Sequence, residues 1–383
     1  MRTLCRWVKR ATLVLFVLLV LLAIFLAATP QGRAASKTVG LVLQVVPNFP
    51  VKPLGWFTSE PIRTPVTYRV GQIEAQADEY RIPDGKPRAA VVLFLGVNPA
   101  GRDDDRVVNL GKGLAQAGFV VLVPWSENMA NNRVVPDDIE LLVAALEYLK
   151  SRDYVDPERI GGGGFCVGSS MLLIAATDPR IRDDVAFINF FSGYFDARDF
   201  LKQFVAQRSF YDGTQEPWDP DSLTEKVFTR LLIEGLPNAA ERDAMSGHFT
   251  ANEPIAPEAR ARLSDPADAV YRLLSGTTLE EADELIGRLP QAVQTAMDEL
   301  SPSTYIDDLK ADLLIMHDRE DNLAPVEESR RLRDATADRG GTRYTEFSFF
   351  SHVDPGERVG LLGLIGQSLK LYRHLYSVVR TAT

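Results

Sequence analysis

Short apolar runs alternate with amphipathic segments through the middle of the chain. Four runs have the composition of strands buried on both faces of a sheet: Ala89–Leu95, Phe119–Pro124, Arg159–Phe165 and Val185–Phe191. Helical spacing of apolar residues separates them: Arg106–Ala117, Pro136–Ser151 and Ser169–Ala176. Strands that alternate with helices form a parallel sheet wound by right-handed crossovers, so the pattern predicts the α/β class.

Further stretches extend this core at both ends. Thr67–Val70 and Glu74–Ile82 predict two antiparallel strands ahead of the parallel ones. The alternation resumes late in the chain with a strand, a helix, a strand and a long apolar helix: Ala311–His317, Val326–Ala337, Thr342–Phe350 and about Glu357–Val379. We therefore expect one core domain built from two pieces, 65–196 and 304–383.

Residues 197–303 interrupt the alternation. This stretch has no strand signal but several helix starts, including Pro266 and Pro290 in first turns and a capping box at Thr278–Glu281. Amphipathic helices are expected at 223–235, 266–274, 279–288 and 290–300. The pattern predicts an all-helical cap inserted into the core.

A basic stretch and a long apolar run open the chain. Ala11–Ala28 is apolar apart from one Thr, and its length is about the minimum for a membrane-spanning helix. Positive charges precede it and keep the N-terminal tail in the cytoplasm. We expect a signal anchor at 1–29, one transmembrane helix and an extracytoplasmic remainder, with a cleaved, secreted form as the alternative. The Pro-rich stretch 30–64 predicts a tether with a short strand at Val39–Val46.

Net charge and cysteine content exclude several classes of binding partner and site. The formal net charge is −10, and an acidic surface repels phosphate backbones, so we expect no nucleic-acid partner. The chain has two cysteines, Cys5 and Cys166, and the first lies on the cytoplasmic side of the expected anchor. A disulfide framework and a cysteine-based zinc site are therefore excluded. Cys166 is either a small buried hydrophobe or a reactive thiol.

The glycine-rich stretch around Cys166, IGGGGFCVGSS, does not fit a phosphate-binding loop. The dinucleotide fingerprint G-x-G-x-x-G would need Gly where Cys166 or Val167 stands. A P-loop with the Gly163 to Gly168 spacing would need Lys where Ser169 stands, and that Lys is the residue that pairs with the phosphates.

The same stretch fits a nucleophile elbow. Gly164 and Gly168 flank Cys166 as G-x-Cys-x-G, between a predicted strand and a predicted helix. Such a turn strains the central residue and needs small neighbours where the chain crosses itself closely. Gly161–Gly163 are expected to belong to the strand. The helix N-terminus is expected to lower the pKa of the Cys166 thiol.

A cysteine nucleophile needs a base and a group that orients it. His352 follows the strand at Thr342–Phe350 in a loop, whereas His317 ends a strand and is expected to be structural. Asp318 and Asp321 both follow that earlier strand, and the spacing to the next proline turn favours Asp321. The order nucleophile, acid, His is that of an α/β-hydrolase, and each group follows a strand of the predicted sheet.

With these residues in place, the chain resembles the dienelactone hydrolase family of the α/β-hydrolase superfamily. The resemblance covers about 66–379 apart from the insertion, and is carried by VDPERIGGGGFCVGSS, LLIMHDREDNLAP and SHVD. It implies an α/β-hydrolase fold, a Cys166–His352–Asp321 triad, and hydrolysis of a small-molecule ester or lactone through an acyl-enzyme. The anchor and the helical cap depart from the family pattern.

The oxyanion hole is expected to use two main-chain N–H groups. One belongs to Val167, which follows the nucleophile, and the other comes from the loop after the first parallel strand. Pro99 has no N–H, so Val97 or Asn98 is the second donor. No metal or organic cofactor is expected.

Two other functions fit the same residues. An acyltransferase would pass the acyl group to an alcohol or amine held beneath the cap, and a non-catalytic binding protein would retain the fold with an unreactive Cys166. The intact order of Cys, Asp and His argues against the binding protein, whereas the sequence does not separate a hydrolase from an acyltransferase.

Overall fold

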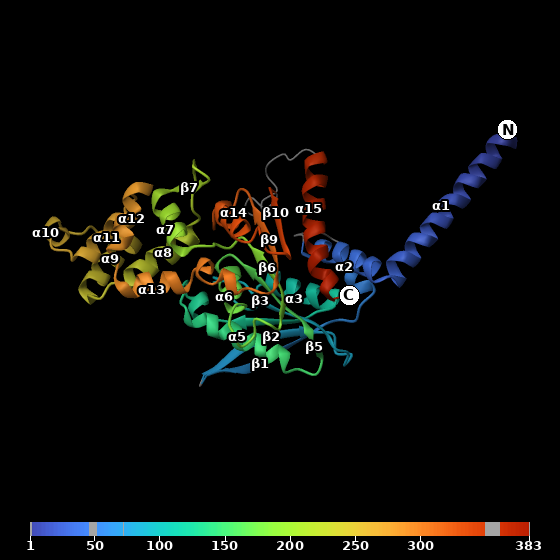
Figure 1. The fold of residues 1–383 in the computed structure, drawn as a ribbon, viewed down its shortest axis with the longest axis horizontal. Helices are drawn as coiled ribbons and strands as arrows, with labels where there is room; N and C mark the ends of the chain where they lie inside the picture. Colours follow the sequence, from blue (N-terminus) through green and yellow to red (C-terminus); the bar gives the residue numbers. More distant parts are fainter. Residues whose placement is uncertain (1, 46–51, 72, 349–360, 383) are drawn as a thin grey trace.

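The computed structural model describes all residues except 1, 46–51, 72, 349–360 and 383. Within that part of the chain, eight strands form one sheet in the order β1-β2-β4-β3-β5-β6-β9-β10 (Figure 1). β1 pairs with β2, and β2 with β4, in antiparallel fashion, and the other neighbours are parallel. The bounds are β1 Ile62–Val70, β2 Ile73–Arg81, β3 Arg88–Phe94, β4 Val120–Trp125, β5 Val155–Phe165, β6 Val185–Phe191, β9 Asp312–Asp318 and β10 Thr342–Phe347.

The helices cover both faces of this sheet. α3 (Asp105–Ala117) and α15 (Leu361–Val379) pack on one face, and α5 (Asp137–Lys150) and α6 (Val167–Ala175) on the other. α14 (Val326–Ala335) lies against β9 and β10. The short helices of the core and its approaches are α4 (Glu127–Ala130), η2 (Pro302–Thr304), η3 (Ile306–Asp308) and η5 (Arg380–Ala382).

β3 shows why the apolar runs form central strands. Its side chains point alternately to the two faces, and both faces are covered. Val91 and Leu93 belong to the apolar cluster beneath α3, whereas Val92 and Phe94 belong to the cluster beneath α5 and α6. The predicted mostly parallel α/β sheet is confirmed, and the fold is α/β-hydrolase-like.

The β6–β9 segment, as we call residues 197–303, replaces a simple crossover between two adjacent parallel strands. It forms most of the left-hand part of Figure 1. Its elements are α7 (Ala197–Ala206), β7 (Arg208–Tyr211), β8 (Thr214–Pro217), α8 (Ser222–Glu234), α9 (Ala239–Ala251), α10 (Pro257–Arg260), α11 (Asp265–Leu274), α12 (Leu279–Gly287) and α13 (Gln291–Glu299).

The prediction that this segment is all-helical was wrong in one place. β7 and β8 form an antiparallel hairpin around Asp212 and Gly213, both at positive φ. Four-residue strands with a largely exposed surface give almost no period-2 hydrophobic signal, so the hairpin is hidden in the sequence. The helices expected at 223–235, 266–274, 279–288 and 290–300 are α8, α11, α12 and α13.

The N-terminal region differs from the prediction. A strand at Val39–Val46 was expected within a tether, but Pro30–Val45 is the helix α2, followed by the short helix η1 (Pro53–Trp56). α2 packs against α3 and α15, and Ala34, Thr38 and Leu41 are buried. Leu41 joins the cluster beneath α3 because helical spacing aligns it with Ala34 and Thr38 on one face.

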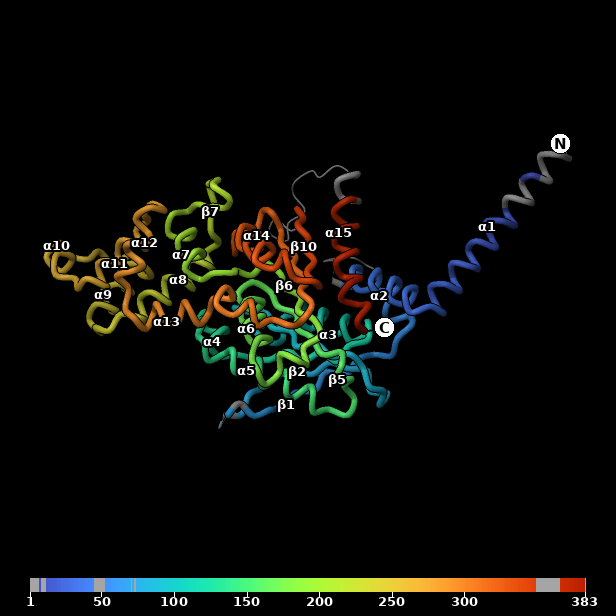
Figure 2. Tube along the Cα trace, in the orientation of Figure 1, coloured from blue at the N-terminus to red at the C-terminus, as the bar shows by residue number. Residues whose placement is uncertain are grey.

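α1 (Arg2–Ala28) projects away from the rest of the molecule (Figure 2). Among the described residues, no single helix has the length and hydropathy needed to cross a membrane. Thr12–Ala28 and Pro30–Gln44 meet that requirement only as a pair, and the pair is bent by 91°.

Candidate active site

Cys166 occupies the sharp turn between β5 and α6. Its backbone has φ 51° and ψ −137°, a conformation that is costly for a residue with a side chain. The Cys166 N–H donates to the Phe191 carbonyl at 2.9 Å, and its carbonyl accepts from the Ser169 N–H at 2.9 Å. Hydrogen bonds on both sides thus hold the strained residue in place at the N-terminus of α6.

Glycines make this turn possible by close approach. A Cβ on Gly164 would lie 2.3 Å from Ser169 Cα, and one on Gly168 would lie 2.5 Å from Gly96 N. Gly96 itself has φ +69° and lies in the loop after β3. Gly161–Gly163 belong to β5, as expected, and pair there with β3. Gly164 thus lets the chain pass close to the start of α6, and Gly168 lets the β3 loop approach the turn.

The electrostatics at Cys166 differ from the expectation. The side chain is half-buried and packs against the larger apolar cluster. Burial raises the pKa of its thiol to about 12, and the Asp321 carboxylate adds to the rise, while the Val167 N–H opposes it. The expected lowering by the helix N-terminus was therefore wrong, because desolvation outweighs that one N–H. The resting thiol is protonated and needs a base.

Asp321 lies in the loop after β9, and its charge acts on Cys166. The Asp321 Oδ1 atom accepts from the N–H groups of Leu323 at 2.7 Å and Ala324 at 3.3 Å. The second candidate acid, Asp318, is buried at the end of β9 and accepts from the Glu320 N–H at 3.0 Å. The structure therefore places Asp321 where its negative charge raises the pKa of the Cys166 thiol.

His317 has both ring nitrogens engaged in structural contacts. Nε2 lies 3.0 Å from the Ala324 carbonyl, which can only accept, so Nε2 carries the proton. Nδ1 then accepts from the Ser329 hydroxyl at 2.6 Å. Burial lowers the pKa of His317, although Asp321 Oδ2 lies 3.7 Å from Nε2. The ring is neutral and leaves the Asp321 charge available to another group.

The remaining predicted residues divide into two groups. His352 lies outside the described residues, so its role remains a prediction from chain order. Val167 begins α6, and its N–H points to the Cys166 sulfur. Val97 and Asn98 lie in the β3 loop, where the Asn98 side-chain amide donates to the Gly101 carbonyl at 3.3 Å. That loop contacts the elbow through Gly96, as a second oxyanion donor would require.

Sequence reasoning missed Ser192, which directly follows β6. It is buried and has φ 51°, like Cys166, and the two strands before them pair Phe165 with Phe191. Its Oγ atom has no hydrogen-bond partner among the described residues. The signal was a serine directly after a buried strand and directly before Gly193, since Cys166 likewise directly follows β5.

The described residues contain no group of three or more His, Cys, Asp or Glu placed to hold a metal ion.

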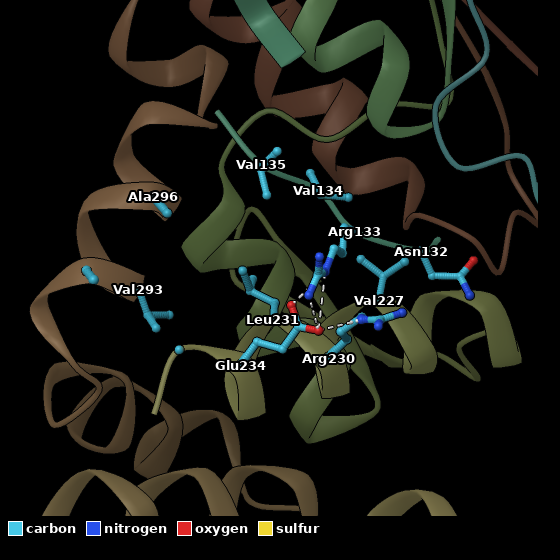
Figure 3. Close-up of a pocket in the computed structure, with 12 residues that line it drawn as sticks. Asn132, Arg133, Val134, Val135, Val227, Arg230, Leu231, Glu234, Val293 and Ala296 are labelled. Atoms are coloured by element: carbon cyan, nitrogen blue, oxygen red, sulfur yellow. Dashed lines mark hydrogen bonds and ion pairs between the residues drawn. The ribbon is translucent and has the colours of Figure 1, made fainter. Parts of the chain in front are cut away.

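A cavity of about 180 Å³ lies apart from Cys166 and Asp321, between the 132–135 loop and helices α8 and α13 (Figure 3). At its wall, Arg133 and Arg230 both pair with Glu234, at 2.9 and 2.7 Å. Neither Cys166 nor Asp321 lines it.

The comparisons with known proteins give partial and distant likenesses. No protein-family model matches the chain. A probable 2-oxo-3-(5-oxofuran-2-ylidene)propanoate lactonase from a Bradyrhizobium species is 32% identical over 142 residues, which are 31% of this chain and 56% of the relative. The chain thus spans little more than half the length of that lactonase.

Similar solved structures are more distant. An esterase from the archaeon Pyrobaculum calidifontis is 14% identical, with 94% of this chain and 98% of that chain covered and a TM-score of 0.45. The acylaminoacyl peptidase of Pyrococcus horikoshii is 15% identical, with 85% and 41% covered and a TM-score of 0.46. These likenesses are too remote to carry an argument. The assignment of an α/β-hydrolase-like fold rests on the strand order and on the turn at Cys166.

Proposed function

We propose that the protein hydrolyses a carboxylic ester or lactone through an acyl-enzyme on Cys166, with His352 as base and Asp321 as the group that orients it. One observation carries the proposal: Cys166 stands on a strained strand-to-helix turn within reach of the Asp321 charge. A backbone strain of this kind persists where the surroundings enforce it, and such positions gather at active sites.

The first half of the reaction forms the acyl-enzyme. His352 takes the Sγ proton as the sulfur attacks the acyl carbon, and the carbonyl electron pair moves onto oxygen. When the tetrahedral adduct collapses, the C–O bond to the leaving group breaks and His352 returns the proton to that oxygen. The high pKa of the resting thiol makes this base necessary.

The second half consumes water. His352 removes a proton from water, hydroxide adds to the thioester carbon, and the C–S bond breaks. The sulfur regains a proton and the acid product leaves. In this proposal Asp321 orients His352 and stabilises the imidazolium in both halves.

Main-chain N–H groups stabilise the oxyanion in this proposal. Val167 supplies one, and Val97 or Asn98 in the β3 loop supplies the other. Support comes from the contact between that loop and the turn, where a Cβ on Gly168 would meet Gly96 N at 2.5 Å.

The substrate class rests on chemistry and on the partial likeness. A thiol nucleophile with a His base can cleave the bond between an acyl carbon and its ester oxygen. The Bradyrhizobium relative is named a lactonase. We extend that name to this chain as the class of bond, a carboxylic ester or lactone.

The test uses the full chain in detergent with p-nitrophenyl acetate and a simple enol lactone. Cys166→Ala is expected to lower kcat by at least about a thousandfold, because the nucleophile is lost. Cys5→Ser is the control, since it removes the other cysteine and should keep full turnover. Undiminished turnover in Cys166→Ala would overturn the proposal.

We also propose that α1 anchors the protein in a membrane, with the core on the extracytoplasmic side. The large apolar side chains of α1 from Leu13 to Phe25 are exposed, for example Leu13, Phe16 and Leu19 at 62%, 62% and 55%. Such a surface is unfavourable in water and favourable in lipid. Carbonate-resistant membrane association of the full chain, lost when residues 1–28 are deleted, is the expected result. Release of the full chain into the soluble fraction would contradict it.

A further inference from the structure

The loop that carries Asp321 is held by the β6–β9 segment. Three consecutive carbonyls of the loop accept hydrogen bonds from that segment, one from each of three donors. The Trp218 indole N–H donates to the Asp321 carbonyl at 3.0 Å. The Asp221 N–H donates to the Asn322 carbonyl, and the Thr224 hydroxyl to the Leu323 carbonyl, both at 2.8 Å.

The opposite side of the same loop holds the carboxylate. Oδ1 of Asp321 accepts from the N–H groups of Leu323 and Ala324, and the Ala324 carbonyl accepts from His317. The direction of the carboxylate thus depends on the main chain of residues 321–324. A rotation of these peptide planes would turn the carboxylate away from Cys166.

The donors are themselves fixed in position. Trp218 packs against Phe200 at a ring-centroid distance of 6.1 Å, and Phe200 packs edge-on against Phe228 at 4.9 Å. Thr224 is buried in the first turn of α8. Asp221 caps α8 by accepting from the Leu223 N–H at 2.7 Å. An aromatic cluster and a helix N-terminus therefore present the three donors as one unit.

We propose that Trp218 and Thr224 are positioning residues that act through Asp321, and that the start of α8 is a fixed part of the active site. This inference rests on the proposed function, in which Asp321 orients His352. It predicts that losing one donor changes the chemical step and its pH dependence, while substrate binding is little affected.

Two substitutions remove single donors with little change of shape. Trp218→Phe loses the indole N–H and keeps an aromatic ring, and Thr224→Val loses the hydroxyl. Each is expected to lower kcat about 3- to 10-fold with KM within about twofold, from the loss of one hydrogen bond. The limb of the pH profile that reports His352 is expected to move to lower pH, because a displaced carboxylate stabilises the imidazolium less.

Matched controls separate positioning from general destabilisation. Thr229→Val makes the same change five positions further along α8, also at a buried position. Trp56→Phe makes the same Trp-to-Phe change at an exposed residue that is far in sequence from the Asp321 loop. Both controls should keep the wild-type kcat and pH profile.

Hydrogen exchange of the 319–325 peptide gives a readout that does not need turnover. The Leu323 and Ala324 amides are expected to exchange faster in Trp218→Phe and Thr224→Val than in wild type or the controls. Wild-type exchange in both variants would overturn the inference, and so would faster exchange with an unchanged pH profile. If wild type lacks ester hydrolysis, the proposed function fails, and the exchange data alone decide whether α8 holds the loop.

Discussion

The turn that carries Cys166 and the loop that carries Asp321 follow strands of the same sheet but are held in different ways. The turn depends on its own glycines and on chain neighbours, as Gly164 meets Ser169. The loop depends on Trp218 and Thr224, about a hundred residues earlier in the chain. The tight packing of the turn thus comes mostly from residues close to it in sequence, whereas the loop adds to its own hydrogen bonds three others from residues about a hundred positions away. Four predictions test this contrast.

The largest expected effect is the loss of the acid. Asp321→Asn should lower kcat about a thousandfold, because the amide no longer stabilises the imidazolium and can select the wrong tautomer. Steady-state hydrolysis of p-nitrophenyl acetate measures it.

Asp318→Asn is the matched control for that substitution, since Asp318 is the other acid after β9. If Asp318→Asn loses turnover and Asp321→Asn keeps it, Asp318 is the acid that orients His352 and the assignment of Asp321 is wrong.

The same Asp321→Asn variant tests the charge at Cys166. Removing the carboxylate charge lowers the thiol pKa from its value of about 12, so the fraction of thiolate at pH 8 rises. Iodoacetamide labelling of Cys166, followed by peptide mass spectrometry, should become about tenfold faster. An unchanged rate would mean that the two side chains are not electrostatically linked.

The close crossing at the Cys166 turn predicts that alanine substitutions at two adjacent glycines differ strongly in their effect on stability. Gly164→Ala should cost about 3 kcal/mol of unfolding free energy, because a Cβ would lie 2.3 Å from backbone at Ser169. Gly163→Ala is the matched control, with its nearest atom an ordinary 3.7 Å away on Leu93. Denaturant unfolding measures both, and equal stability of the two variants would refute the close crossing.

The attachment of the β6–β9 segment to the core should depend on pH through Glu328. This buried carboxylate on α14 accepts from the N–H groups of Phe195 and Asp196 at 2.9 and 3.0 Å and from the Gln203 amide at 2.7 Å. Burial raises its pKa from 4.5 to about 7, against the opposing effect of Arg331.

The folded protein therefore keeps the Glu328 proton to higher pH than the unfolded chain. Its contribution to stability is present below about pH 4.5 and is lost as pH rises to about 7. Relative to Glu328→Gln, wild type should lose up to about 3 kcal/mol of unfolding free energy across that window. Glu280→Gln, exposed on α12, should follow wild type. Parallel stability curves for wild type and Glu328→Gln would contradict this.

Much of the core was predictable because its signal is local. The runs at Ala89–Leu95 and Val185–Phe191 became the buried strands β3 and β6 with shifts of at most one residue. The G-x-Cys-x-G motif indicated the turn at Cys166, because the required glycines lie within two positions of it.

The features that could not be predicted depend on burial and on contacts between residues distant in sequence. The thiol pKa was expected to be low from the helix N-terminus alone, and only packing shows the desolvation that raises it. Pro30–Val45 was expected to be part of a tether, and its helix packs against α3 and α15. Trp218 has no motif that links it to Asp321, since their bond exists only in the folded chain.

The right-angled junction of α1 and α2 has a mechanical consequence. Thr29 bridges the bend, because its hydroxyl donates to the Phe25 carbonyl and accepts from the Gly32 N–H, at 2.8 and 2.9 Å. α2 in turn is packed onto the core through Leu41. α1 is therefore joined to the core through a hydrogen-bonded bend and a packed helix, and not through an irregular tether. In the proposed membrane-bound state, this bend would set the orientation of the core, and with it the Cys166 turn, relative to the bilayer.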